Sequence, residues 1–88
     1  MNIELNCGIW VNIEKEVFDD MQIVDLLAEL EDGNGLVISK LSKLIFKPED
    51  KKAIYNALKD EHGRIPVNKF AETFTEIFTK LGESGKNS

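Results

Sequence analysis

The chain has 88 residues, which is enough for one small domain and too few for two. Hydrophobic residues make up 42% of it and charged residues 31%, a composition that excludes a disordered chain and suits a globular one. Its net charge of −5 argues against nucleic acid as the main partner.

The cysteine count and the N-terminal sequence indicate the cellular compartment of the protein. Cys7 is the only cysteine, so an internal disulfide is excluded and a reducing cytoplasm is favoured. The first ten residues, MNIELNCGIW, have neither a basic start nor an apolar stretch as long as that of a signal peptide. Because the longest apolar runs are triplets, we expect no membrane-spanning segment and no membrane partner.

Charge is distributed unevenly along the chain. Residues 1–32 contain one basic and nine acidic side chains, a net charge of −8, whereas residues 33–88 contain ten basic and seven acidic ones, a net charge of +3. This asymmetry either promotes head-to-tail self-association or reflects two solvated faces of opposite charge, and the second explanation is the simpler one.

The N-terminal segment, about residues 1–15, differs from the rest of the chain. The runs IEL and IWVNI flank NCG, with β-branched or aromatic residues in partial alternation. This pattern predicts a short β-hairpin, which must pack on another element because an isolated hairpin is only marginally stable.

The segment FDDMQIVDLLAELEDG predicts the first helix. Asp19 is the expected N-cap, Gln22 completes a capping box, and Gly33 ends the helix. The apolar residues expected on its buried face are Ile23, Val24, Leu27 and Leu30.

Two shorter helices are predicted next. LVISKLSKLIF is one, and the other runs from Pro48 to about residue 60 with Gly63 as its terminator, because proline suits a first helical turn. The residues expected to be buried are Val37, Leu41, Leu44 and Ile45 in the first of the two helices and Ala53, Ile54, Ala57 and Leu58 in the second.

The last helix has the most regular pattern. It begins at Pro66, and Gly82 is expected to close it. Its apolar residues recur every three or four positions, and these are Val67, Phe70, Ala71, Phe74, Ile77, Phe78 and Leu81. The sequence therefore predicts a mainly α protein: a single domain over residues 1–82, built as a bundle of about four helices with an N-terminal hairpin, and a flexible tail at residues 83–88.

The segment KDEHGRIPVNKF has part of the pattern of a calcium-binding EF-hand loop. With its glycine at the sixth loop position, Leu58 takes position 1, Asp60 position 3, His62 position 5 and Lys69 position 12. Calcium requires oxygen ligands at these positions, including a bidentate glutamate at the last. The second glycine turn, LEDGNGLVISKL, fails in the same way because Leu30 and Leu41 fall at its ends. We therefore expect structural turns and no metal ion.

No arrangement of residues indicates an enzyme or a cofactor. His62 is the only histidine and lies in a polar turn, and Cys7 has neither metal-ligand spacing nor a neighbour that would activate it. The acidic pairs Asp19–Asp20 and Glu49–Asp50 fall at helix N-termini, where capping accounts for them. A nucleophile with its base and stabiliser is missing from the sequence.

Apolar surface is therefore the remaining candidate for function. The core is the default place for the phenylalanines of the last helix, Phe70 and Phe74 above all. A chain this short has little room to bury every apolar residue, so an exposed patch for partner binding or self-association is a second possibility. The candidate partner-binding residues are Trp10, Phe74, Phe78 and Leu81.

Residues 15–83 resemble the tail assembly chaperones of long-tailed bacteriophages and prophages of Gram-positive hosts. The resemblance lies in DDMQIVDLLAEL as a first helix, in the LIF…ED junction, and in LKDEHGRIPVNKF, where the family often has an acidic turn followed by glycine, arginine, valine or isoleucine, and proline. The chain departs from the family at Lys47–Pro48, where the family often has a turn that contains glycine.

The resemblance implies a small, mainly helical protein in the cytoplasm of a bacterial host. Such a protein binds the tape measure protein, keeps it soluble, helps to recruit tail tube subunits, and self-associates. Two alternatives stay open from the sequence: a degenerate, calcium-independent EF-hand-like adaptor that binds a helical peptide, and an accessory subunit of an enzyme.

Overall fold

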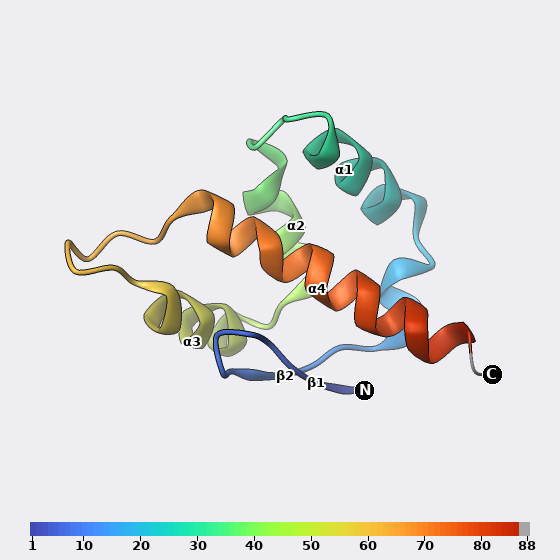
Figure 1. Cartoon of the computed structure of the whole chain (residues 1–88). Helices are drawn as coiled ribbons and strands as arrows, with labels where there is room; N and C mark the ends of the chain where they lie inside the picture. Colours follow the sequence, from blue (N-terminus) through green and yellow to red (C-terminus); the bar gives the residue numbers. More distant parts are fainter. Residues whose placement is uncertain (87–88) are drawn as a thin grey trace.

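The computed structural model describes the backbone of residues 1–86 and the side chains of residues 1–81. It has four helices and a two-stranded antiparallel hairpin, so the predicted fold class is confirmed (Figure 1). The elements in chain order are β1 (Asn2–Glu4), β2 (Trp10–Asn12), a 3₁₀ turn (Lys15–Phe18), α1 (Met21–Glu31), α2 (Val37–Ile45), α3 (Pro48–Leu58) and α4 (Val67–Lys86).

The hairpin closes through a tight turn at Asn6–Gly8. The N–H of Gly8 donates to the carbonyl of Leu5 at 2.8 Å, and Gly8 has a φ of 91°, which glycine adopts without steric cost. Ile3 lies opposite Val11 across the strands, and both are buried. The hairpin therefore has an inner face in the core, as a two-stranded sheet requires for stability.

Helix α1 begins one residue later than predicted. Asp20, not Asp19, is its N-cap, and the Oδ1 atom of Asp20 accepts a hydrogen bond from the Gln22 N–H at 2.9 Å. Asp19 instead closes the preceding 3₁₀ turn, where its N–H donates to the carbonyl of Glu16. The predicted end is confirmed: Gly33 follows the helix with a φ of 95°.

The N-cap of α1 can be removed by substitution, which tests where this helix begins. We expect Asp20→Ala to lower the free energy of unfolding by about 1 kcal/mol, since an N–H in the first turn loses its acceptor. For a domain of this size, that corresponds to a fall in Tm of about 4–8 °C. Asp19→Ala removes the same charge one residue earlier and is the control. Thermal unfolding followed by circular dichroism measures both, and an equal loss for the two variants would contradict the assignment.

The buried faces of α1 and α2 are rotated from the predicted ones. Ile23 and Leu26 are the buried residues of α1, whereas Val24 is exposed. In α2, Ile38 is buried and Leu44 is exposed. Each predicted buried face lies on a helix that the structure contains, but it included one neighbouring residue that is exposed. Apolar steps of three or four residues define the direction of a helix face only to within about one position.

Helix α3 begins at Pro48, as predicted, and ends at Leu58, before Gly63. Ile54 is fully buried, but Ala57 is exposed, so the predicted buried face was too wide. Gly63 has a φ of 77° and reverses the loop between α3 and α4, five residues after the helix has ended. It is a loop glycine and not the terminator that the sequence predicted.

Helix α4 is the longest element and runs diagonally through the middle of Figure 1, with α1 above it and α3 below it. It continues through Gly82 to Lys86, so the predicted end at Gly82 is wrong, and residues 83–86 of the predicted tail are helical. A single glycine inside a helix costs only about 1 kcal/mol, which weakens a helix without stopping it. The rest of the predicted tail, residues 87–88, lies outside the described residues.

Candidate functional site: an apolar groove between α1 and α4

An open groove lies between α1 and α4, with a cavity volume of about 550 Å³. Its exposed lining is mainly apolar. The residues that line this α1–α4 groove are Val24, Leu27, Ala28, Leu30, Glu31, Asn68, Ala71, Glu72, Thr75 and Phe78.

The packing of the helices explains why the groove exists. Helix α1 approaches α2 most closely and α4 approaches α3 most closely, so the backbones of α1 and α4 are less closely packed than either of these pairs. Ala28 on one side and Ala71 on the other are too short to fill the space between the two helices. An apolar cleft between helices is a common place for a ligand or a partner segment to bind.

Phe78 is the largest side chain that lines the groove. Its ring centroid lies 5.6 Å from that of Phe18, at an interplanar angle of 73°, which is a favourable edge-to-face arrangement. Even with this contact, Phe78 is 51% exposed. A large aromatic ring that is held by one neighbour and open on its other side is a suitable anchor for a partner.

The four predicted partner-binding residues do not form one surface. Phe78 lines the groove, whereas Trp10, at 62% exposure, belongs to β2 and lies outside the groove lining. Phe74 is fully buried, which confirms the core as its default place, and Leu81 is only 6% exposed, so neither belongs to an exposed patch in this conformation. They lie on the core face of α4 together with Phe70 and Ile77.

Several groove residues were missed because they have the pattern of core residues. Leu27 and Leu30 are half-buried and were expected to face the core. Ala28 gives no signal in a sequence, since alanine is common on any helix face. The one useful sign was that a chain this short has little room to bury every apolar residue.

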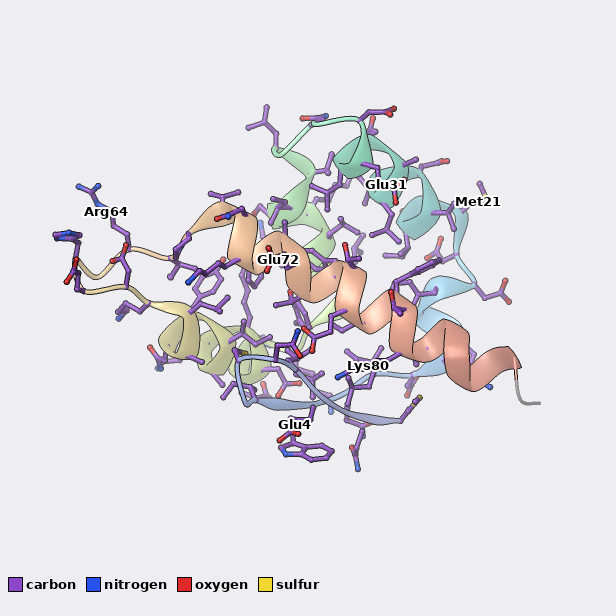
Figure 2. All side chains as sticks on the ribbon, viewed as in Figure 1. Glu4, Met21, Glu31, Arg64, Glu72 and Lys80 are labelled. Atoms are coloured by element: carbon purple, nitrogen blue, oxygen red, sulfur yellow. The ribbon has the colours of Figure 1, made fainter. Side chains whose placement is uncertain are left out.

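Two ionisable side chains line the groove, and both are carboxylates. Glu31 projects from α1 and Glu72 from α4, and both are exposed (Figure 2). We call this pair the acidic rim. In the described part of the chain, neither carboxylate belongs to an ion pair.

The turn with the EF-hand spacing has a different internal organisation. The Oδ1 atom of Asp60 accepts hydrogen bonds from the N–H groups of His62 and Arg64, each at 2.9 Å. This carboxylate therefore stabilises its own loop, as in an Asx-turn. Among the residues that the structure describes, no group of three potential metal ligands of the histidine, cysteine, aspartate or glutamate type comes together.

The two residues considered for catalysis lie in separate turns. His62 is exposed in the α3–α4 loop, with its Nε2 atom 3.6 Å from the Oε1 atom of Glu61. Cys7 is half-buried in the turn of the hairpin. The α1–α4 groove is the candidate site of the described residues, and its lining offers apolar contact and an acidic rim.

The described residues form a small, mainly helical protein with a groove between two helices. No helix within this part of the chain is both long and apolar enough to cross a membrane. Comparisons with protein-family models, curated proteins and solved structures returned no match.

Proposed function

We propose that this protein is a phage tail assembly chaperone that acts through the α1–α4 groove. It binds a helical part of the tape measure protein in the cytoplasm of the bacterial host, keeps that protein soluble, and helps to recruit tail tube subunits. It works by contact and not by catalysis. The observation that carries the proposal is the open apolar groove with Phe78 at its surface.

The form of the groove supports a helical client. An amphipathic helix binds a hydrophobic groove through side chains at positions i, i+3, i+4 and i+7, and the α1 and α4 side chains that line this groove present a mainly apolar surface to such a helix. A long helical protein exposes apolar stripes until it is assembled, and covering them prevents aggregation. The resemblance of residues 15–83 to the chaperone family points to the same client.

The adaptor alternative draws on the loop between α3 and α4. In that loop, the Asp60 carboxylate accepts hydrogen bonds from two backbone N–H groups and so stabilises a turn with EF-hand-like spacing. An adaptor would use the same groove for a short peptide of another protein. The identity of the client therefore separates the two functions.

Co-expression with a tape measure fragment tests the chaperone function. The wild-type protein is expected to raise the soluble fraction of the fragment several-fold. Phe78→Ser removes the exposed anchor of the groove and is expected to weaken binding about thirtyfold, which corresponds to the loss of about 2 kcal/mol that marks an interface hot spot. Trp10→Ser is the matched control, since it removes an aromatic ring that is at least as exposed and lies outside the groove lining.

The outcomes are distinct. If the wild-type protein leaves the solubility of the fragment unchanged, the chaperone function is wrong. If Trp10→Ser abolishes the effect while Phe78→Ser retains it, the client binds the hairpin and not the groove. The gene order gives an independent check, because a tail assembly chaperone gene should lie between a tail tube gene and a long tape measure gene.

A further inference from the structure

Glu31, the member of the acidic rim on α1, lies within the most acidic part of the chain. Between residues 16 and 39 the sequence contains no lysine or arginine. The acidic residues of this stretch are Glu16, Asp19, Asp20, Asp25, Glu29, Glu31 and Asp32. One side of the groove, helix α1, is therefore negative along its whole length.

The other side of the groove adds a free carboxylate. Glu72 lines the groove and is exposed, and among the described residues it takes part in no ion pair. Glu76, one turn further along α4, differs: its Oε1 atom accepts from the Asn6 N–H at 2.6 Å and lies 3.3 Å from the Lys80 Nζ atom. The charge of Glu76 is thus compensated within the fold, whereas that of Glu72 is not.

We infer that the segment bound in the α1–α4 groove is a basic amphipathic helix, with an apolar stripe flanked on both sides by lysine or arginine. This inference rests on the proposed function, which makes the groove the client site, and it specifies the chemistry of the client. The apolar stripe packs on Val24, Leu27 and Phe78, and the basic side chains reach Glu31 on one side and Glu72 on the other (Figure 2).

The chemistry of long basic side chains suits this arrangement. Lysine and arginine lay their aliphatic stems along apolar surface and keep the charged group in water, so they cover the edges of the groove without burying a charge. An acidic flank would place like charges side by side and would be rejected. The groove thus selects helices by the charge on the flanks of the apolar stripe.

Three synthetic helices with one apolar face test the inference. Each is about 20 residues long, enough for measurable helicity, and the flanking positions are all lysine, all glutamine or all glutamate. Fluorescence anisotropy with the full-length protein gives the Kd of each at about 0.02 M and about 0.5 M salt. We expect the lysine helix to bind about tenfold more tightly than the glutamate helix at low salt, with the preference largely lost at high salt.

Substitutions in the acidic rim test whether its two carboxylates cause the preference for the lysine helix over the glutamate helix. Glu31→Gln combined with Glu72→Gln is expected to reduce the lysine-over-glutamate preference to about twofold or less. The control is Glu29→Gln combined with Glu61→Gln, which changes the net charge equally at exposed positions outside the groove lining and should retain the preference. If both double variants behave alike, the preference reflects overall charge and the inference fails.

The remaining outcomes separate this inference from the proposed function. If the three helices bind with equal affinity, the charge selection is wrong while the groove remains a helix site. If none binds because the chain self-associates through the groove, which sedimentation would show, the occupant is a second copy and the inference is overturned. If the lysine helix binds selectively but the tape measure fragment stays insoluble, the chaperone function fails and the charge selection stands.

Discussion

Phe74→Ala is expected to lower the free energy of unfolding by about 3–5 kcal/mol, the usual cost of removing a buried phenylalanine ring. Phe74 is fully buried. Its ring centroid lies 5.6 Å from that of Phe46, at the end of α2, and 5.4 Å from that of Phe70 in α4. The variant therefore loses aromatic contacts between two elements as well as buried area. Urea unfolding followed by circular dichroism gives the difference.

Phe78→Ala is the matched control, because it removes the same side chain four residues further along the same helix. Phe78 is half-exposed and has one aromatic contact, with Phe18, so we expect a loss of about 1 kcal/mol. A small domain has a total stability of about 5–15 kcal/mol, so the first variant would lose a large part of it and the second would not. Equal losses would show that the ring of Phe78 is a core residue in solution.

The helices could be predicted from the sequence because their periodicity is local information. In α4, the steps of three and four residues establish that Phe70, Phe74 and Ile77 share one face. The same steps also connect Val67, Ala71 and Phe78, which form a neighbouring row. The first row is buried and the second contains groove and surface residues. The sequence does not distinguish the two rows, because the distinction depends on where α1, α2 and α3 lie.

Two of the glycines predicted to end helices show the same limit of sequence-based prediction. Gly33 follows a complete amphipathic helix, and the chain turns there with a positive φ, as predicted. Gly82 follows an equally good helix, yet α4 continues through it. Glycine permits a left-handed turn but does not require one, so the next element must supply the reason to turn. After Gly33 that element is α2, which packs against α1.

The candidate site was harder to predict than the fold. A groove is defined by what is missing between two helices, and here the missing volume arises from Ala28 and Ala71, on elements about forty residues apart. The exposure of Phe78 was expected from its position near the end of an apolar stripe, whereas Leu81 was expected to be exposed for the same reason and is buried. Leu81 continues the row of Phe70, Phe74 and Ile77, and this row faces the core.

Leu5→Ala is expected to lower the free energy of unfolding of the whole domain by about 2–5 kcal/mol, because the hairpin contributes to the core. Leu5 is 1% exposed, and its hairpin neighbours Ile3, Val11 and Ile13 are equally buried. The hairpin is also bound to α4, where Glu76 accepts from the backbone of the turn and the Lys80 Nζ atom donates to a carbonyl of β1.

A cooperative fold requires that loss of the Leu5 side chain destabilises the helices as well. Urea unfolding followed by the helical signal at 222 nm and by Trp10 fluorescence should therefore give one shared transition, shifted to lower urea. Trp10→Ala, on the outer face of the same hairpin and read by the helical signal alone, is the control and should change stability by less than about 0.5 kcal/mol. An unshifted helical transition in Leu5→Ala would mean that the hairpin is an appendage. In that case the four helices would have to form the core, and the groove between α1 and α4, without it.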